Sequence, residues 1–246
     1  MDIIISAVTQ RTGSTLVQRI FNARKQTLIW GEHGGIISEF LRIGVLAGYF
    51  SEHGKPEKDA FFKGGKDTTT WIANMSPDYE YIDNGIIQSV KTLLQVMYSE
   101  YREHHDRIGF KEVRYGKQEL QLLKRCYPDA IVVLLVRNPI HIWKSETIYW
   151  AGEVKQFCKA WNERTLEYGE LQNPDEGIYL LRYEDIVERD EKTLQLLSEL
   201  ADVQLEAINN VLRIHLNSTS KERSIEDMET IRSNCQQGME LLRYLG

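Results

Sequence analysis

The sequence has few of the residues that mark a disulfide-bonded or metal-binding protein. Only three cysteines occur in 246 residues, Cys126, Cys158 and Cys235, and they are too scattered for a disulfide framework or a zinc site. We expect each of them to be a small buried hydrophobic residue in a reducing compartment. The pair His104-His105 ends a charged segment without a cysteine ligand, so we expect solvated side chains there and no bound metal.

The sequence also lacks a basic excess and a long apolar run. There are 36 acidic and 30 basic side chains, a net charge of −6, which argues against general nucleic-acid binding. The longest apolar window, residues 36–50, contains Glu39 and Arg42, so no membrane span is predicted. The short apolar run at residues 3–8 has no basic start, unlike a signal peptide. We therefore expect a cytoplasmic protein without membrane partners.

The chain has enough apolar residues for a core, with 42% hydrophobic and 10% aromatic residues. Four apolar runs predict buried strands, at residues 2–8, 108–111, 131–137 and 177–183. Three- and four-residue apolar spacing predicts helices at residues 16–23, 36–49, 86–101, 117–125, 140–149, 154–171 and 193–201. This alternation predicts a single α/β domain over residues 1–246, with a parallel sheet of four or five strands flanked by helices.

Two further segments have a different character. Residues 51–79 combine glycines, prolines and a run of threonines without regular spacing. Such a polar segment is typical of a lid or binding loop, and a disordered connection is the alternative. Residues 224–245 predict a helix that packs with Ile231, Met239 and Leu242 inward.

The strongest chemical signal lies between the first strand and the first helix, in the segment Val8-Thr9-Gln10-Arg11-Thr12-Gly13-Ser14-Thr15-Leu16. A glycine at this turn lets backbone amides approach an anion from a helix N-terminus. Arg11 adds a permanent charge, and the Ser14 and Thr15 hydroxyls add donors. We predict that the segment holds a phosphate-like group; the alternative is a capped strand-to-helix turn. The segment is not a Walker A loop, which needs a second glycine and a lysine.

A second anion site is predicted where the strand at residues 131–137 ends in Arg137-Asn138-Pro139. Ligands of open α/β sheets collect at the carboxyl ends of strands, and Pro139 suits the first turn of the next helix. Arg137 can pair with a phosphate, and the Ser145 hydroxyl can be a second donor. The alternative is an arginine in a surface salt bridge.

Three segments together resemble the sulfotransferase family that uses PAPS, 3′-phosphoadenosine 5′-phosphosulfate. Arg11-Thr12-Gly13-Ser14-Thr15 is similar to the family's 5′-phosphosulfate loop, and Arg137-Asn138-Pro139 with Ser145 is similar to its 3′-phosphate motif. The third match is Leu181-Arg182-Tyr183-Glu184-Asp185-Ile186. The resemblance covers residues 2–33, 107–146 and 177–201, and it implies a P-loop-like parallel sheet.

The resemblance also implies a reaction, the transfer of a sulfuryl group from PAPS to a hydroxyl or amine without metal, with PAP as the product. Fixed cations should stabilise the charge of the transition state, and Arg11 is the first candidate. Lys111 is the second, because Lys111-Glu112 with Arg114 resembles the family's catalytic lysine segment. The alternative for Lys111 is a surface lysine at a strand end.

The base that takes the acceptor proton is expected in Trp30-Gly31-Glu32-His33, which resembles the tyrosylprotein branch of the family. We favour Glu32, with His33 as the rival because its ordinary pKa suits neutral pH. The alternative is a turn that merely carries a polar pair. Gly34-Gly35 would let an acceptor approach the backbone.

Further contacts are expected around the cofactor and acceptor. Ser220, Lys221 and Arg223 could contact phosphate from a late loop, with a solvated loop as the alternative. Tyr183 could line the cofactor pocket or lie in the core. Among the tryptophans, Trp30 and Trp71 are expected near an acceptor, whereas those at positions 143, 150 and 161 are expected in the core. Residues 185–191 are expected to be a solvated helix entry with caps.

We therefore predict a PAPS-dependent sulfotransferase acting on a small molecule, such as a bacterial secondary metabolite. The acidic residues Glu32, Glu39 and Asp67 would suit a cationic acceptor, for example an alkaloid. One alternative is a P-loop nucleotide or nucleoside kinase, although the Walker lysine and a clear magnesium carboxylate are missing. The other is a PAP-binding protein without catalysis. No nucleic-acid partner is expected, and a homodimer is left open.

Overall fold

The computed structural model describes the chain except for residues 146–152, 215–219, 221 and 245–246. The strands are β1 Ile3–Ala7, β2 Thr27–Trp30, β3 Arg107–Glu112, β4 Ile131–Val136 and β5 Ile178–Arg182. The helices are α1 Ser14–Phe21, α2 Ile36–Lys63, α3 Tyr79–Met97, α4 Lys117–Cys126, α5 Pro139–Ser145, α6 Val154–Leu171, α7 Tyr183–Val187, α8 Glu191–Ala201, α9 Leu205–Arg213, α10 Ile225–Asn234 and α11 Gln236–Leu241. Two short 3₁₀ turns are η1 Arg102–His104 and η3 Pro174–Glu176.

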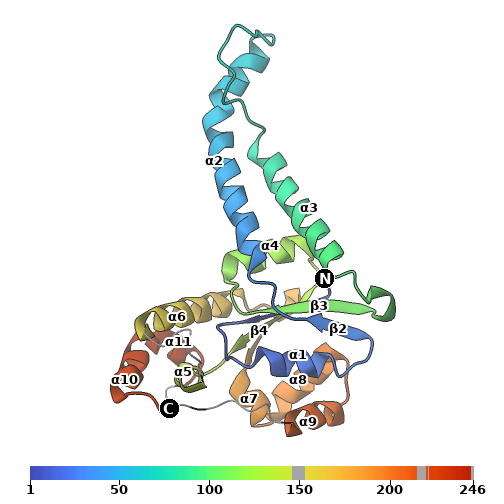
Figure 1. Cartoon of the computed structure of the whole chain (residues 1–246), viewed down its shortest axis with the longest axis vertical. Coiled ribbons are helices and arrows are strands. Elements are labelled where there is room, and N and C mark those ends of the chain that lie inside the picture. Colours follow the sequence, from blue (N-terminus) through green and yellow to red (C-terminus); the bar gives the residue numbers. More distant parts are fainter. Residues whose placement is uncertain (146–152, 215–219, 221, 245–246) are drawn as a thin grey trace. The chain divides into compact units, whose positions relative to one another are not determined.

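The five strands form one parallel sheet in the order β2-β3-β1-β4-β5 (Figure 1). Helices flank this sheet on both faces, so the predicted α/β class with its parallel sheet is confirmed. The sequence interpretation did not assign β2, because a strand of four residues, Thr27 to Trp30, is too short for a recognisable apolar run.

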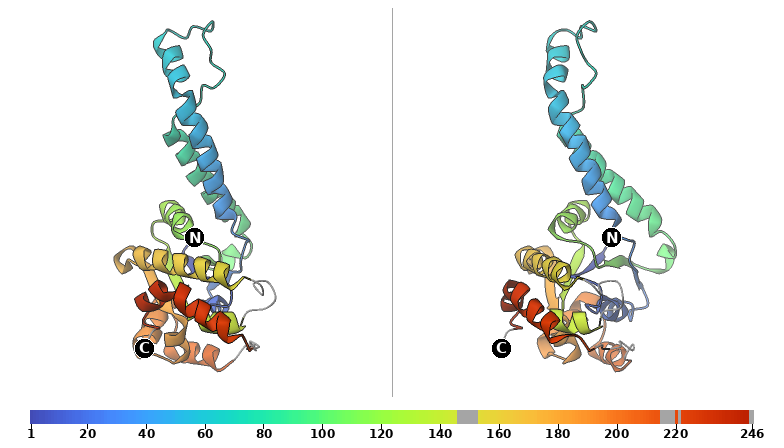
Figure 2. Two further views of the ribbon diagram at one scale, coloured as in Figure 1. Left: turned by 90° about the vertical axis from the view of Figure 1, so that its left-hand side faces the viewer. Right: turned by 60° about the vertical axis from the view of Figure 1, so that its left-hand side comes forward.

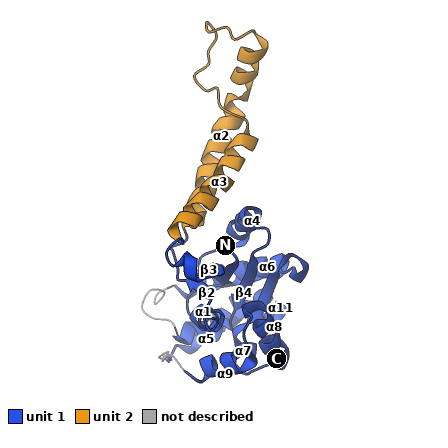
Figure 3. Cartoon of the chain, turned by 90° about the vertical axis from the view of Figure 1, so that its right-hand side faces the viewer, with its two compact units in different colours: residues 1–35, 98–246 blue, residues 36–97 orange. Residues whose placement is uncertain are grey.

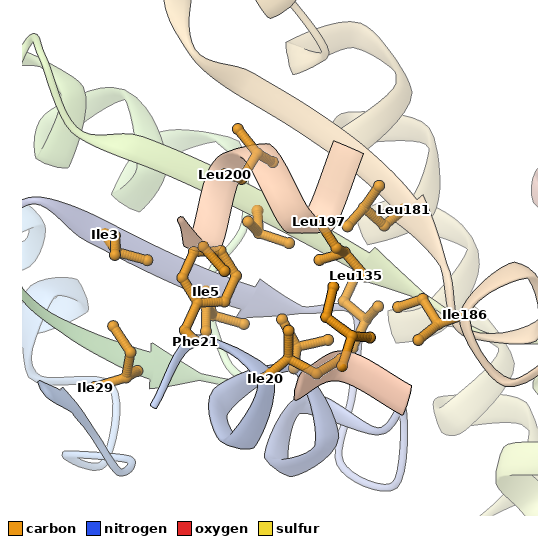
Figure 4. Close-up of a cluster of buried hydrophobic side chains, with 14 of the residues drawn as sticks. Ile3, Ile5, Ile20, Phe21, Ile29, Leu135, Leu181, Ile186, Leu197 and Leu200 are labelled. Atoms are coloured by element: carbon orange, nitrogen blue, oxygen red, sulfur yellow. The ribbon is translucent and has the colours of Figure 1, made fainter. Parts of the chain in front are cut away.

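Successive side chains of β1 point to opposite faces of the sheet, as the two-residue period of a strand requires. Ile3 and Ile5 pack with Phe21 of α1 and Leu197 of α8 in one buried cluster (Figure 4). On the other face, the hydroxyls of Ser6 and Tyr168 lie 2.7 Å apart, which ties β1 to α6. β1 is therefore held from both faces of the sheet.

The chain divides into two compact units, one of residues 1–35 with 98–246 and one of residues 36–97 (Figure 3). The first unit contains the sheet and all helices except α2 and α3. The second unit consists of α2, α3 and their connection, and its two helices run side by side (Figure 2).

The second unit corrects part of the secondary-structure prediction. Helix α2 continues through Pro56 to Lys63, so only residues 64–78 of the predicted loop are non-helical. The non-helical connection packs against α2. The Ser51 hydroxyl donates to Pro77 O at 2.7 Å, and the Glu57 carboxylate accepts from Asn74 N at 2.9 Å. Such contacts can outweigh the poor helix propensity of a proline.

The helix predicted at residues 224–245 is buried as expected, but it is not one continuous helix. Two helices, α10 and α11, replace the single one and meet at Cys235, while Ile231, Met239 and Leu242 are buried as expected. All three cysteines are free and buried, also as expected. None of the helices in the described part of the chain is long and apolar enough to cross a membrane.

Candidate active site

The predicted site residues come from the carboxyl edge of the sheet, where the parallel strands end together. In the spatial order of the strands, Glu32 follows β2, Lys111 lies at the end of β3, Arg11 follows β1, Arg137 follows β4 and Tyr183 follows β5. Neighbouring strands are about 4.8 Å apart, so these side chains form a row along one edge. Residues distant in the sequence are thus arranged along a single line.

The loop between β1 and α1 is shaped for close approach by an anion. Arg11 and Gly13 both have positive φ angles, 64° and 100°. The buried Thr12 hydroxyl donates to Thr9 O at 2.7 Å, so this side chain fixes the loop from within. Among the described residues, none accepts a hydrogen bond from the backbone amides of residues 13–15. Those amides remain available to a ligand at the start of α1.

The two predicted anion segments contact each other. Arg137 donates from Nη1 to Arg11 O at 2.9 Å, and Arg11 donates from Nε to Ser145 O at 2.9 Å. The Arg137 guanidinium lies 4.3 Å from the centre of the Tyr183 ring. A Cβ atom at Gly13 would meet that ring at 2.3 Å, so Tyr183 packs directly on the loop. The fold therefore brings both segments and Tyr183 to one place.

The hydrogen-bonding state of Arg137 and Ser145 differs. The Arg137 Nε atom is buried and has no hydrogen-bond partner within the described part of the chain. The buried Ser145 hydroxyl donates to Ile142 O at 3.0 Å. Arg137 thus has a spare donor, whereas Ser145 would have to exchange its present bond to bind a ligand.

The predicted late loop is only partly described. Lys221 lies outside the described residues, and Ser220 is exposed. Arg223 donates from Nε to Trp143 O at 3.1 Å and its guanidinium lies 5.0 Å from the Trp143 ring centre. Arg223 is therefore attached to α5, the helix that follows Arg137.

At the other side of the row, Lys111 and Glu32 form a close ion pair. Lys111 Nζ lies 2.6 Å from Glu32 Oε1, and Arg114 Nη1 lies 3.0 Å from Glu32 Oε2. The Lys111 side chain is only 10% exposed, which excludes the alternative of a surface lysine. A largely buried ammonium beside a carboxylate is typical of a functional site.

The pKa of Glu32 is held below its ordinary value. Burial acts to raise this pKa, but hydrogen bonds and charge interactions with Lys111 and then Arg114 together outweigh it. Glu32 is therefore a carboxylate at neutral pH.

His33 lies in an aromatic enclosure. Its side chain is 7% exposed, its ring centre lies 4.8 Å from that of Phe110, and its Nε2 lies 3.1 Å from the Tyr115 hydroxyl. Burial lowers the pKa of His33, the charge of Glu112 opposes this, and Arg114 lowers it further. His33 is thus neutral near pH 7 and is less accessible to an acceptor than Glu32.

The family of the chain follows from a match over most of its length. A sequence model described as the sulfotransferase family matches residues 4–207, which include β1 to β5 and all the residues of the row. The chain belongs to the sulfotransferase family. No curated protein sequence matches it significantly.

Solved sulfotransferase structures have the same fold. The domain from the curacin biosynthetic pathway has 16% identity and a TM-score of 0.53, covering 98% of this chain and 97% of its own. The olefin synthase domain of Synechococcus PCC 7002 has 14% identity and a TM-score of 0.52, covering 99% and 94%. The sulfotransferase of Alicyclobacillus acidocaldarius has 13% identity and a TM-score of 0.50, covering 100% and 95%.

Several other predicted features of this sulfotransferase can be placed. Trp143 and Trp161 are buried as expected, Trp71 is exposed, and Trp150 lies outside the described residues. Trp30 is half-buried and stacks on Tyr98 at 6.1 Å between ring centres. Among the described residues, no group of three or more His, Cys, Asp or Glu could hold a metal ion.

The acidic segment after β5 is also in place. Asp190 caps α8, because its carboxylate accepts from Thr193 N at 2.9 Å, as predicted for a helix entry. A cavity of about 210 Å³ lies nearby but contains none of the predicted site residues. Its lining is Leu180, Leu181, Arg182, Asp185, Thr193, Leu241, Leu242 and Arg243.

Two buried carboxylates were missed by the sequence interpretation as members of the site. Glu112 follows Lys111 and is fully buried, and Glu184 follows Tyr183 and is 9% exposed. Both lie in segments that carry the family resemblance, and only this resemblance could have indicated that they belong to the site. Their sequence neighbours give no indication that they would be buried.

Proposed function

We propose that this sulfotransferase transfers a sulfuryl group from PAPS to a hydroxyl or amine of a small-molecule acceptor. One observation carries the proposal. Arg11 and Arg137 lie together beside the unpaired amides of the β1–α1 loop, and neither has a carboxylate partner among the described residues. Uncompensated positive charge next to free amides favours an anionic ligand with phosphate groups.

The residues present fit PAPS on two further points. Gly13 has no side chain where Tyr183 packs, so the Tyr183 ring can lie directly against the loop and line a pocket there. The buried Nε of Arg137 has no partner within the described residues, and a buried unpaired donor is costly unless something binds it. Both points favour a phosphate-bearing ligand at the β1–α1 loop and Arg137.

Specific residues are assigned to each part of the cofactor. Arg11 and the amides and hydroxyls of residues 12–15 would hold the 5′-phosphosulfate, with Leu16 anchoring the start of α1 in the core. Arg137 and Ser145 would hold the 3′-phosphate, and Tyr183 would line the pocket. Further phosphate contacts are proposed for Ser220, Lys221 and Arg223. We call the residues after β1, β4 and β5 the cofactor end.

The residues of β3 and of the turn after β2 form the acceptor end. PAPS supplies a sulfuryl group attached to a phosphate leaving group. Lys111 and Arg11 would stabilise the negative charge that develops during transfer. Glu32 would take the proton of the acceptor. An anion that draws Lys111 away from Glu32 removes a main cause of its low pKa, so Glu32 becomes a stronger base when the site is filled.

Glu32 is preferred to His33 as the base for a geometric reason. The Glu32 side chain is 31% exposed, whereas the His33 ring is enclosed by Phe110 and Tyr115. A base must reach the acceptor within hydrogen-bond distance. The resemblance of this turn to the tyrosylprotein branch supports the same assignment.

The acceptor is proposed to be a small molecule, such as a secondary metabolite, and the fold likeness to a domain of the curacin biosynthetic pathway favours this class.

A cationic acceptor is less well supported, because each of the three acidic residues expected to bind it already has a partner within the chain. Glu32 is paired with Lys111, Glu39 with Arg42 at 2.9 Å, and Asp67 accepts from Thr69. The lid role of residues 51–79, a cytoplasmic location and a homodimer stay predictions.

The test is sulfuryl transfer from labelled PAPS to a panel of phenols, aliphatic alcohols and amines. We expect transfer to at least one neutral acceptor, with activity lost in Glu32→Ala. Cofactor binding without transfer to any acceptor would favour a PAP-binding protein without catalysis. Turnover of ATP with magnesium, in the absence of transfer, would favour the nucleotide kinase.

A further inference from the structure

Two buried carboxylates, Glu112 and Glu184, lie at opposite ends of the row of site residues. Glu112 ends β3 at the acceptor end, and Glu184 follows β5 at the cofactor end. Glu112 is 0% exposed and Glu184 is 9% exposed. Neither has a role in the transfer described above. A carboxylate is buried only where donors surround it, so the donors of each one indicate what it does.

Glu112 binds the turn that carries the base. Its Oε2 accepts from Gly35 N at 2.9 Å and from His33 N at 3.3 Å. Its Oε1 accepts from Val113 N at 2.8 Å and from Arg114 Nη1 at 2.5 Å. The backbone amides of the turn after β2 are therefore held at the end of β3 by the Glu112 carboxylate.

Glu32 depends on this attachment from two sides. It immediately precedes His33, whose amide Glu112 holds. Arg114 Nη1 also contacts both carboxylates, so the same guanidinium fixes Glu32 and Glu112 together. Without Glu112, both the backbone and the cation beside Glu32 would lose their anchor.

Glu184 has the corresponding contacts at the cofactor end. Its Oε1 accepts from Asn138 N at 2.9 Å, directly after Arg137. Its Oε2 accepts from the Tyr244 hydroxyl at 2.7 Å, and His141 Nδ1 lies 3.7 Å from Oε1. Glu184 thus attaches the turn after β4 to the segment after β5 and to the C-terminal segment.

We propose that Glu112 and Glu184 are two separate positioning residues, Glu112 for the base-bearing turn and Glu184 for the phosphate-binding turn at Arg137. This assignment of roles rests on the proposed function. Because no described residue bonds to both carboxylates, loss of one should disturb its own end of the row and leave the other end intact.

A glutamine cannot replace Glu112. Both carboxylate oxygens accept from backbone amides, so a glutamine in either orientation would place its NH₂ group against an N–H donor. At position 184 a glutamine would keep both contacts, because its carbonyl oxygen can accept from Asn138 N and its NH₂ group can donate to the Tyr244 hydroxyl. The matched tests are therefore Glu112→Gln and Glu184→Met, which remove acceptors at the two ends with little change in volume.

The experiment compares amide hydrogen exchange and PAP affinity in the two variants. A control is Glu167→Gln, since Glu167 accepts from Lys117 N at 3.0 Å at the start of α4, away from the row. We expect Glu112→Gln to speed exchange about tenfold or more among the amides of residues 33, 35 and 113, which Glu112 holds, and not at residue 138. We expect Glu184→Met to speed exchange at residue 138 and not at those three residues, and to weaken PAP binding about tenfold.

Transfer activity supplies the third measurement where an acceptor is known. Glu112→Gln should lower kcat with PAP affinity unchanged, and Glu184→Met should raise the KM for PAPS with a smaller effect on kcat. If either variant does not fold, Arg114→Gln and Tyr244→Phe remove one donor from Glu112 and Glu184 respectively. Each should then speed exchange at the same amides as the variant it replaces.

Equal effects of both variants on PAP affinity, or exchange that changes at both ends together, would overturn the proposal. Unchanged exchange at residues 33, 35 and 113 in the first variant, or at residue 138 in the second, would also overturn it. Failure of the proposed function would look different. In that case the wild-type protein would not bind PAP, while the exchange measurements would still separate the two ends.

Discussion

The two ends of the row of site residues balance their charges differently. At the acceptor end, Lys111 and Arg114 face Glu32 and Glu112, so two cations meet two carboxylates. At the cofactor end, Arg11 and Arg137 bond to backbone carbonyls, and the salt bridges of the described residues include neither. A compensated cluster can hold a base in place, whereas uncompensated cations attract an anion. The charge balance thus distinguishes the end proposed for catalysis from the end proposed for cofactor binding.

The largest effect is expected when the acceptor end loses Lys111. We expect Lys111→Ala to lower the rate of sulfuryl transfer about 10²–10³-fold, because a fixed cation near the developing charge is lost. PAP lacks the sulfuryl group, so its affinity should change by less than about 1 kcal/mol. Steady-state kinetics and calorimetry provide the two measurements.

A suitable control for this prediction is Lys117→Ala. Lys117 pairs with Glu170 at 2.7 Å and is 39% exposed, so its loss should leave the stability nearly unchanged. Equal rate losses in both lysine variants would contradict a specific role for Lys111.

The next largest effect is expected at the cofactor end, from Gly13→Ala. The positive φ of Gly13 and the Tyr183 ring at 2.3 Å leave no room for a methyl group. We expect a loss of about 2–4 kcal/mol in stability, with weaker PAP binding. Thermal unfolding should show a Tm lower by roughly 5–15 °C.

Gly31→Ala is the matched control for Gly13→Ala. No atom lies within 4 Å of a Cβ at Gly31, and its φ is not positive. This variant should unfold at nearly the wild-type temperature. A similar Tm loss in both variants would mean that Gly13 has no special steric requirement.

The smallest effect concerns the pH dependence of the acceptor end. The pKa of Glu32 is lowered in part by Arg114, so Arg114→Met should raise that pKa. A base must be ionised to act, and the acid limb of kcat/KM should therefore move to higher pH. The opposite shift, or none, would mean that Glu32 is not the base that this limb reports.

The comparison also explains which parts of the site were predictable from the sequence. Arg11, Gly13 and Arg137 follow apolar strands directly, and strand ends in a parallel sheet converge, so their meeting could be predicted. Glu112 and Glu184 could not be recognised as structural, because their partners are backbone amides and a tyrosine far away in the sequence. Burial of a charge is set by the folded chain and leaves no local pattern.

The fold was predictable to a similar degree. The long apolar strands identified the sheet, but the four residues of β2 gave no pattern, although Glu32 follows that strand directly. Helix α2 was underestimated, because Gly54 and Pro56 indicate a break that contacts with residues 74–77 overcome. A Cβ at Gly54 would meet Asn74 O at 1.9 Å, so the glycine permits close packing inside the helix.

The proposed function depends above all on the binding of PAP by uncompensated cations at the cofactor end. The most direct measurement is calorimetric titration of the wild-type protein with PAP, ATP and ADP, repeated for Arg137→Ala. Arg107→Ala is the control, since Arg107 also donates to a backbone carbonyl, Leu200 O at 3.0 Å, but at the opposite end of β3. We predict that PAP binds more tightly than ATP and loses about 1.5–3 kcal/mol of binding free energy in Arg137→Ala alone. Equal binding of PAP and ATP, or equal losses in both arginine variants, would contradict the account.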